Sequence, residues 1–267
     1  MGVKTVITLN EINKIFPSYD FISLTPTTSG IIDTTYIIST HHKSYILKKY
    51  EREIPQKIQK DKQLLNELKS SGLNVPTCID ENKSWFLYER LKGSSPTNIQ
   101  IFHIQEVARF LAKLHKYSYK RNCDEDFIKS YEIPKLLNYT KSNFFSYYKK
   151  LQFLNNYKAK NDGFIHGDLF KDNTVFDDKK IGVFDFIDSA CGNFSFECAV
   201  ALVGFDTLKR KNYFINIFIK SYNQHAPKKI EKKELLKQID MACGFYALLR
   251  IHTNKSTTKA KELIYFC

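Results

Sequence analysis

The chain has 267 residues, 43% of them hydrophobic and including 16 Tyr and 21 Phe, so it can bury a sizeable core in one large domain or two small ones. This composition excludes wholesale disorder. The 41 Lys and Arg against 28 Asp and Glu give a formal net charge of +13, a balance that occurs in proteins that bind nucleic acids, membranes or small anions.

The basic charge comes mostly from Lys and accompanies abundant Ile, Asn, Phe and Tyr, which indicates a general residue bias. No Arg-rich tract or RNA-binding signature is present, so we expect no nucleic-acid partner. No apolar run approaches the ~20 residues that span a bilayer, and residues 1–16 lack the pattern of a secretory signal. We therefore expect a soluble, cytoplasmic protein with no membrane partner. The six cysteines form no C-x-x-C pair, so we expect reduced thiols.

The first third of the chain reads as strands with one helix. Residues 34–39 and 43–50 are β-branched and aromatic runs separated by a polar turn, which predicts a hairpin. Residues 56–71 carry apolar side chains on one helical face, and Gly72 ends that helix. Residues 84–91 predict another strand.

The remainder is mainly helical. Apolar residues at 104, 107, 111 and 114 share a helix face, and helical patterns resume from about Phe194. Between them, residues 164–186 contain short apolar runs broken by turns. Residues 92–96 break regular structure. The sequence thus predicts an α+β fold with a small β-rich lobe, residues 1–91, and a larger helical lobe, residues 92–267.

The segment His166-Gly167-Asp168 is followed by Asn173 after five residues and by Asp185 after twelve more. Phosphoryl transfer from ATP needs metal ions that bridge the phosphates, and a carboxylate that orients the attacking hydroxyl and takes its proton. An Asn carbonyl and an Asp carboxylate are suitable Mg²⁺ ligands. We therefore predict Asn173 and Asp185 as metal ligands, joined by a short hairpin, and Asp168 as the catalytic base.

Each of these residues also has a simpler interpretation. Asp168 and Asp185 could cap turns, and Asn173 could be a turn residue. Their joint spacing, between strand-like runs and downstream of a β-rich lobe, favours the catalytic interpretation. We keep the structural interpretation for His166, which we expect to brace the loop.

The segment resembles the aminoglycoside phosphotransferase and choline kinase superfamily, whose pattern is H-G-D-x-x-x-x-N followed by two apolar residues and Asp. A sharper resemblance is to bacterial type II homoserine kinases, which carry H-A-D-L-F-x-D-N-V-L-F and then I-D-F-x-x-A-C. This chain has HGDLFKDNTVF at 166–176, FDF at 184–186 and Ala190-Cys191, and residues 242–250 also resemble a helix of that family.

The resemblance spans nearly the whole chain, but only residues 166–192 are specific. It implies a protein-kinase-like, bilobal fold with ATP and Mg²⁺ as cofactors. The chain departs from the homoserine kinases at Gly167, where those enzymes usually have Ala, and at Asp188. Because of these two differences, the resemblance does not determine which alcohol is the acceptor.

The resemblance also assigns nucleotide binding to residues upstream: Lys48, Ser29, Gly30, Glu89 and Leu91. Lys48 would contact the ATP phosphates, although Lys49 is adjacent. The usual helix Glu partner of that lysine is not evident, since residues 56–63 offer Asp61 but no Glu. His115, in an L-x-x-L-H pattern, and Glu197 match further family positions and are expected to be structural.

The most specific hypothesis is that the chain phosphorylates a small-molecule alcohol, L-homoserine, to O-phosphohomoserine, a step of threonine biosynthesis. Homoserine carries an ammonium and a carboxylate, so its pocket needs an acid and a base, for which Asp188 and Arg250 are candidates.

Two alternatives remain open. A choline, ethanolamine or aminoglycoside kinase would share the motif, but aminoglycosides need an acid-rich pocket, and residues 207–267 hold 13 Lys and Arg against 4 Asp and Glu. Choline kinases tend to carry H-N-D-L and an aromatic and acidic stretch that this chain lacks. The second alternative is a non-catalytic nucleotide-binding protein of the same fold, against which the intact Asp168, Asn173 and Asp185 argue. The sequence does not indicate an oligomeric state.

Overall fold

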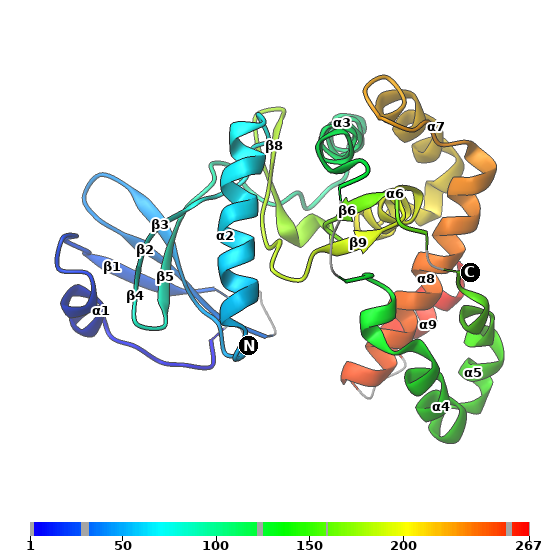
Figure 1. The fold of residues 1–267 in the computed structure, drawn as a ribbon, viewed down its shortest axis with the longest axis horizontal. Helices are drawn as coiled ribbons and strands as arrows, with labels where there is room; N and C mark the ends of the chain where they lie inside the picture. The colour runs from blue at the N-terminus through cyan, green and yellow to red at the C-terminus, as the bar shows by residue number, and fades with distance from the viewer. Residues whose placement is uncertain (1–2, 28–31, 122–124, 159, 255–257, 267) are drawn as a thin grey trace. The chain divides into compact units, whose positions relative to one another are not determined.

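The computed structural model describes residues 3–27, 32–121, 125–158, 160–254 and 258–266 (Figure 1). The chain divides into two compact units. Unit 1 consists of Met1–Gly93 and Gly182–Ile187, and unit 2 of Ser94–Ile181 and Asp188–Cys267. The return of residues 182–187 to unit 1 is a feature that the sequence patterns do not indicate.

Unit 1 contains a five-stranded sheet in the order β1-β2-β3-β5-β4, with every neighbouring pair antiparallel. The strands are β1 (Ser23–Pro26), β2 (Thr34–Ser39), β3 (Ser44–Lys49), β4 (Cys78–Asn82) and β5 (Trp85–Glu89). The predicted hairpin is confirmed, because Thr34 pairs with Lys49 and Ser39 with Ser44. The predicted helix is confirmed as α2 (Pro55–Ser70).

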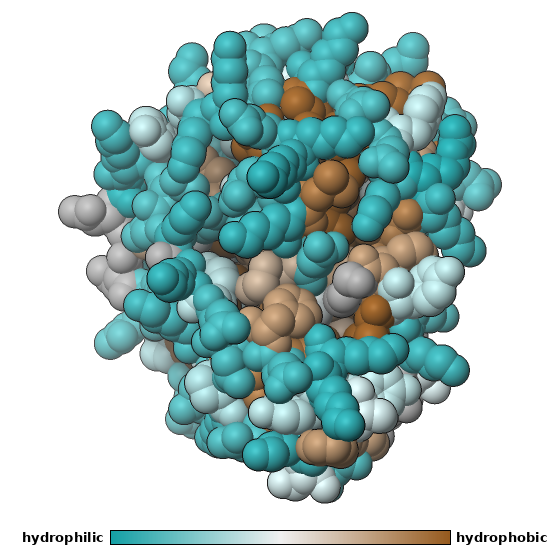
Figure 2. Space-filling model, turned by 90° about the vertical axis from the view of Figure 1, so that its right-hand side faces the viewer, coloured by the Kyte–Doolittle hydropathy of each residue, from teal (hydrophilic) through white to brown (hydrophobic). Residues whose placement is uncertain are grey.

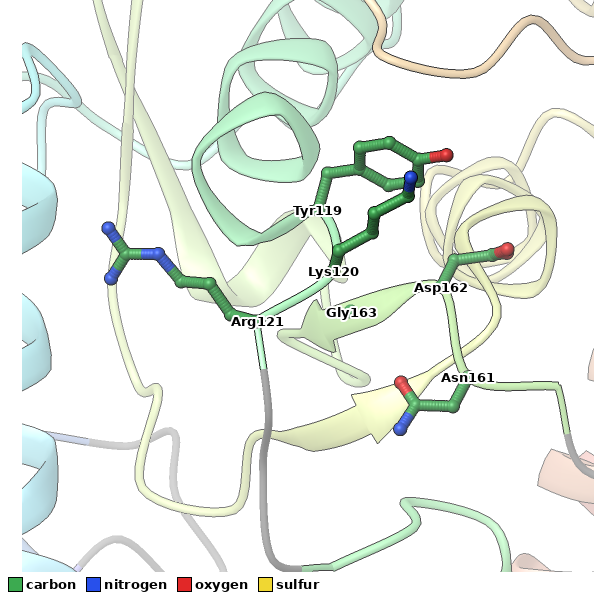
Figure 3. Close-up of a pocket in the computed structure, with 6 residues that line it drawn as sticks. All are labelled: Tyr119, Lys120, Arg121, Asn161, Asp162 and Gly163. Carbon is green, nitrogen blue, oxygen red and sulfur yellow. The ribbon is translucent and has the colours of Figure 1, made fainter.

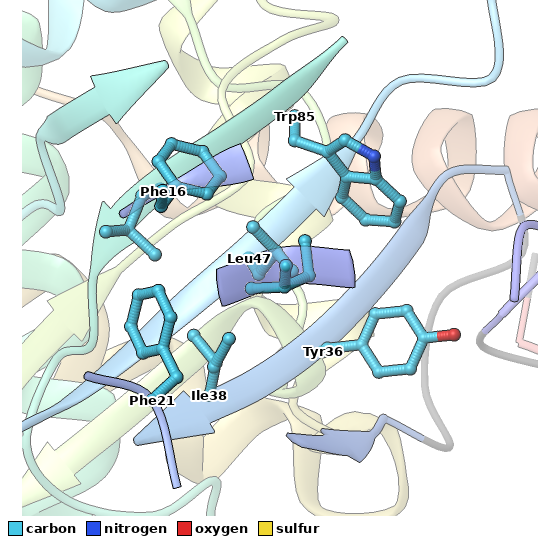
Figure 4. Packing of buried hydrophobic residues seen from close by; sticks show 8 residues of the cluster. Phe16, Phe21, Tyr36, Ile38, Leu47 and Trp85 are labelled. Carbon is cyan, nitrogen blue, oxygen red and sulfur yellow. The ribbon is translucent and has the colours of Figure 1, made fainter. Parts of the chain in front are cut away.

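Successive side chains of β3 point to opposite faces of this sheet. Leu47 is fully buried in a hydrophobic core that also includes residues of α1 (Leu9–Ile15) and its C-terminal end (Figure 4). The other residues of this core are Ile12, Phe16, Phe21, Tyr36, Ile38, Trp85 and Leu87. The opposite face of the sheet packs against α2, where Ile58 joins Tyr50, Phe86 and Ile187. Lys48 follows Leu47 and therefore lies on the α2 face, whereas Lys49 lies on the α1 face.

Unit 2 is mainly helical, as predicted. Its helices are α3 (Ile101–Ser118), α4 (Ile133–Asn143), α5 (Phe145–Leu151), α6 (Phe194–Gly204), α7 (Lys211–Tyr222), α8 (Lys232–Asn254) and α9 (Thr258–Ile264). Every residue of α6 from Phe194 to Val203 is buried. This helix packs against α8, and α3 packs against α7. Helix α6 is thus the buried centre of the unit.

Short strands connect these helices. β6 (Gly163–Ile165) pairs antiparallel with β9 (Ala190–Gly192). β7 (Thr174–Asp177) and β8 (Lys180–Val183) form a second two-stranded sheet, which confirms the hairpin predicted between Asn173 and Asp185. The chain passes from unit 2 to unit 1 within β8, and Val183 N–H then donates to the carbonyl of Asn74 in unit 1 at 3.0 Å.

The face shown in Figure 2 is covered mainly by hydrophilic side chains, with small apolar patches between them. Within the described ranges, no helix has the length and apolarity needed to cross a bilayer. Cys78, Cys198 and Cys243 carry free thiols. Cys191 is disulfide-bonded, so the expectation that all thiols are reduced was wrong.

Candidate active site

The loop between β6 and β7 in unit 2 carries two of the three residues predicted to be catalytic or metal-binding. The Asp168 N–H donates to His166 Nδ1 at 3.2 Å. The Asn173 Nδ2 amide donates to the Asp168 carbonyl at 2.8 Å and to its carboxylate at 3.2 Å. Asp168 is exposed and His166 is buried, so His166 braces the loop as expected. Because the Asn173 nitrogen faces Asp168, its Oδ1 is left as the atom suited to a cation.

Two buried side chains hold the peptide groups around Gly167. One carboxylate oxygen of Glu197, in the first turn of α6, accepts from the N–H groups of His166 and Gly167, the latter at 3.0 Å. The Tyr246 hydroxyl, on α8, donates to the Gly167 carbonyl. Helices α6 and α8 therefore fix the backbone immediately before Asp168.

Gly167 has φ +81°, a left-handed conformation that L side chains rarely adopt. A Cβ atom at this position would overlap the Phe127 ring. Phe127 is 2% exposed and packs against Tyr131 and Phe245. The Phe127 ring therefore explains sterically why this chain has Gly167 where homoserine kinases usually have Ala.

Asp185 lies in unit 1, where its Oδ1 is 2.8 Å from Lys48 Nζ. Lys48 is also 3.9 Å from the carboxylate of Asp33 and lies 4.8 Å from the centre of the Tyr50 ring. Burial opposes the charged form of Lys48, but the negative charges of Asp185, Asp33 and Asp61 outweigh burial and raise its pKa. Lys48 is thus held as a cation among three carboxylates.

Two of those carboxylates were not identified from the sequence as site residues. Asp33 is 9% exposed, accepts from Glu51 N–H at 3.1 Å and pairs with Arg52 at 3.3 Å. Asp61 is 6% exposed on α2 and acts electrostatically on Lys48 from the helix that faces it. An available signal was that Asp61 follows Ile58 by three residues and precedes Leu65 by four, which places it on the apolar face of α2.

Asp185 has φ +70°, a conformation that Asp and Asn adopt more readily than other non-glycine residues. Its side chain is 42% exposed while that of Lys48 is 15% exposed. Lys49, by contrast, bonds the Thr5 hydroxyl at 3.0 Å and lies near Glu51. The alternation along β3 therefore places Lys48, and not Lys49, in this acidic cluster.

The remaining predicted residues are distributed as follows. Ser29 and Gly30 lie outside the described residues. The Glu89 carboxylate is engaged by Lys69 and by the Thr77 hydroxyl at 3.0 Å, and Leu91 is half-buried after β5. Asp188 and Arg250 are half-buried in unit 2.

Arg250 lies one helical turn beyond Tyr246 on α8. Burial raises the pKa of the Tyr246 hydroxyl, the charge of Asp168 raises it further, and the charge of Arg250 opposes these effects. Both charges are therefore close enough to Tyr246 to act on it. The structure thus brings Arg250 near Tyr246, whose hydroxyl bonds the loop that carries Asp168.

Two depressions on unit 2 contain none of the predicted residues. One, of about 240 Å³, is lined by Tyr119, Lys120, Arg121, Asn161, Asp162 and Gly163. Figure 3 shows that Lys120 lies beside Tyr119 while Arg121 extends away from Asp162. The other, of about 570 Å³, is lined partly by Phe102, Arg210 and Tyr213. Over the part of the chain that the structure describes, no cluster of three or more His, Cys, Asp or Glu is suited to a metal ion.

Comparison with known proteins identifies relatives at low sequence identity. A homoserine kinase of Polaromonas naphthalenivorans (strain CJ2) is 22% identical over 243 residues, which cover 81% of this chain and 77% of that protein. The homoserine kinase of Neisseria meningitidis serogroup B (strain ATCC BAA-335 / MC58) is 26% identical, covering 76% of this chain and 73% of the relative.

Solved structures share the fold. Amicoumacin kinase hAmiN, in complex with AMP-PNP, Ca²⁺ and Ami, superposes with a TM-score of 0.73 at 14% identity, covering 96% of this chain and 90% of the other. A microcompartment-associated aminopropanol kinase gives 0.67 at 17% identity, covering 97% and 95%. Choline kinase from Cryptosporidium parvum Iowa II gives 0.68 at 16% identity, covering 96% and 89%. The prediction of a bilobal, protein-kinase-like α+β fold is confirmed.

Residues 23–219 match the sequence pattern described as the phosphotransferase enzyme family. This span covers most of both units and includes Lys48, the whole of the loop with Asp168 and Asn173, and Asp185. The superfamily resemblance seen in the sequence is confirmed, and with it the prediction of an enzyme. The chain belongs to the phosphotransferase enzyme family.

Proposed function

We propose that this enzyme transfers the γ-phosphoryl group of ATP to the hydroxyl of a small molecule, and that the preferred acceptor is L-homoserine, which gives O-phosphohomoserine and ADP. One observation carries the kinase proposal: the loop holds an exposed carboxylate, Asp168, beside an amide, Asn173, whose nitrogen is engaged and whose oxygen is left to bind a cation.

The roles follow from the chemistry of each group. Asp168 orients the acceptor hydroxyl and takes its proton as the oxygen attacks phosphorus and the bond to ADP breaks. Lys48, kept cationic by its acidic neighbours, pairs with the ATP phosphates. Backbone groups at Glu89 and Leu91 meet adenine, and Ser29 and Gly30 cover the phosphates.

Asn173 and Asp185 suit a magnesium ion, because an amide carbonyl and a carboxylate are hard oxygen donors and Mg²⁺ is commonly held by one or two such groups together with phosphates. Asn173 directly precedes β7, and Asp185 lies two residues after the end of its partner strand β8. A bound metal ion would neutralise part of the negative charge of the ATP phosphates. The amicoumacin kinase structure contains AMP-PNP and Ca²⁺, which supports a nucleotide and a divalent cation here.

The support for homoserine has two parts. The relatives at 22% and 26% identity are homoserine kinases. In addition, Arg250 lies near the loop that carries Asp168, and a guanidinium can hold the carboxylate of an amino acid with two parallel hydrogen bonds. Asp188 remains the proposed partner of the substrate ammonium.

Other alcohols are the main alternative, because proteins of this fold include aminopropanol and choline kinases. Choline and aminoglycosides carry cationic groups and no carboxylate. The excess of 13 Lys and Arg over 4 Asp and Glu in residues 207–267 disfavours them electrostatically. A non-catalytic nucleotide-binding role is disfavoured because Asp168, Asn173 and Asp185 are all present.

The test is a coupled assay of ADP release with ATP and Mg²⁺, run with L-homoserine, choline, ethanolamine and kanamycin. We expect the highest kcat/KM for L-homoserine. A higher value for choline or kanamycin would overturn the substrate and leave the kinase activity standing. Binding of MgATP without turnover of any acceptor would favour the non-catalytic alternative.

A further inference from the structure

A chain of buried polar side chains runs through unit 2 to the loop that carries Asp168. It begins at Tyr222 on α7, continues through His115 on α3 and ends at Glu197 on α6. Each of these side chains belongs to a residue that is 0% exposed. His115 Nδ1 lies 2.7 Å from the Tyr222 hydroxyl, and His115 Nε2 lies 2.5 Å from Glu197 Oε2.

The Glu197 carboxylate accepts hydrogen bonds at the end of this series. Glu197 accepts from the N–H groups of His166 and Gly167 through one oxygen and from His115 Nε2 through the other. His115 Nε2 therefore donates to Glu197, and the other ring nitrogen, Nδ1, shares a hydrogen bond with the Tyr222 hydroxyl.

The surrounding packing holds this chain in place. The His115 ring stacks on Phe194, with ring centres 3.9 Å apart and planes inclined by 4°. Phe194 begins α6, and the side chain of Asn193 caps that helix by accepting from Phe196 N–H at 3.0 Å. Glu197 lies in the first turn, where the helix dipole favours a negative charge. Side chains from α3, α6 and α7 thus hold the carboxylate in position.

We propose that His115 and Tyr222 are positioning residues for catalysis. They fix the orientation of the Glu197 carboxylate, which holds the two peptide N–H groups that precede Asp168. The Tyr246 hydroxyl holds the carbonyl of the same Gly167 residue from α8. Asp168 directly follows Gly167 in the chain. A rotation of the Glu197 side chain therefore changes the direction in which the Asp168 carboxylate points. Catalytic groups are sensitive to such shifts, since a displacement of about 1 Å can lower a rate about a hundredfold. The kinetic part of this inference rests on the proposed function.

The alternative is that the buried chain only stabilises the fold. His103 provides the matched control, because it is a second buried histidine on α3, at 7% exposure. Its Nδ1 accepts from Gln100 N–H at 2.9 Å and its ring packs on Phe102 and Phe176. It has no bond to the loop in the described residues. His103→Phe therefore costs a comparable buried hydrogen bond without altering Glu197.

The experiment uses the full chain with His115→Phe, which retains a ring to stack on Phe194, and Tyr222→Phe, which removes one oxygen atom. Amide hydrogen exchange over residues 163–170, measured by NMR or mass spectrometry, reports on the His166 and Gly167 N–H groups without requiring turnover. In the same samples, kcat, KM for ATP and the ratio of ADP released to phosphorylated product are measured with the best acceptor.

We expect faster exchange at His166 and Gly167 in both variants. We also expect kcat to fall about tenfold to a hundredfold in His115→Phe and less in Tyr222→Phe, with KM for ATP within twofold and more ADP released per product. His103→Phe should leave exchange at the loop and the ADP ratio unchanged. If His115→Phe does not fold, the same measurements on Tyr222→Phe test the proposal.

Unchanged exchange at His166 and Gly167 in a folded variant would overturn the proposal, and so would an unchanged kcat or an equal effect of His103→Phe. If no acceptor is phosphorylated by the wild-type chain, the proposed function is wrong. In that case the exchange comparison alone decides whether His115 and Tyr222 position the loop.

Discussion

Lys48 and Asp185 form an ion pair of 2.8 Å within unit 1, although they are 137 positions apart in the sequence. The pair forms because residues 182–187 return to unit 1 and because Lys48 faces α2 on its strand. The proposed phosphate-binding lysine and the proposed metal-binding carboxylate thus belong to the same compact unit. The predictions below address this pair and the loop with Asp168.

Replacing Asp168 by Ala should leave MgATP binding nearly intact and lower kcat by about two to four orders of magnitude, because its proposed role is to accept a proton and not to bind metal. Calorimetry with MgATP and the coupled ADP assay measure the two effects. Asp177→Ala, an exposed carboxylate at the end of β7, is the control. Near wild-type kcat in purified Asp168→Ala would remove Asp168 from the mechanism.

Asp185→Ala should abolish Mg²⁺-dependent nucleotide binding, whereas Asn173→Ala should weaken it less, because a carboxylate interacts more strongly with a hard cation than an amide does. Isothermal titration with ATP, with and without Mg²⁺, provides the measurement. Asp185→Asn, which removes the charge, separates the loss of charge from backbone strain. The assignment of Asp185 fails if MgATP affinity is unchanged in both of its variants.

Asp61→Ala should raise KM for ATP only about twofold to threefold, because Asp61 is the weakest of the three negative charges that act on Lys48 and the other two keep that lysine cationic. Glu67→Ala is the matched control on the same helix, since Glu67 bonds Gln63 at 3.1 Å. Initial rates over a range of ATP concentrations measure both variants. Equal KM values for Asp61→Ala and Glu67→Ala would contradict a role for Asp61.

Gly167→Ala should lower both the melting temperature and kcat, because the left-handed backbone costs a β-carbon about 1–2 kcal/mol and the new methyl group overlaps Phe127. Gly72→Ala is the control: it has φ +82° and no atom within 4 Å of an added Cβ, so it shows the backbone strain alone. Thermal unfolding and turnover are measured for both. The double variant Gly167→Ala/Phe127→Leu should recover part of the loss, and no recovery would contradict the steric explanation.

Arg250→Met should raise KM for L-homoserine about tenfold to a hundredfold, the size expected when a charge-assisted hydrogen bond is lost, and change KM for ATP little. Arg109→Met, which removes an arginine paired with Glu106 on α3, is the control. Kinetics with each substrate varied in turn separate the two constants. An equal rise in both constants for Arg250→Met would argue against carboxylate binding by Arg250.

The sequence predicted the elements whose signal is local. Strands β2, β3 and β5 are rich in β-branched or aromatic residues, and α2 has an apolar face and a glycine after its end. Strand β9 has only three residues, Ala190-Cys191-Gly192, and exists because it pairs with β6. Strands this short have no period of their own, so sequence patterns do not indicate them.

The residues of the candidate site also fall into two groups, those with a local signal in the sequence and those brought together only by the fold. The spacing of Asp168, Asn173 and Asp185 is visible in the sequence because the loop and hairpin that hold them are nearly contiguous. Asp33 and Asp61, the other two acids around Lys48, were not predicted as site residues, because β-sheet register and helix packing bring them to Lys48. The bond from Tyr246 to Gly167 joins residues 79 positions apart, and the sequence gives no sign of it.

The left-handed backbone at Asp185 restricts how this position can vary during evolution. A φ of +70° suits Gly, Asn and Asp, and of these only Asp carries a negative charge. Glu, the other acidic amino acid, has a longer side chain that does not relieve the strain. One residue must therefore satisfy both the backbone and the proposed metal ion, so the usual exchange of Asp for Glu is disfavoured at this position, although Glu132 shows that Glu can adopt a positive φ elsewhere in this chain.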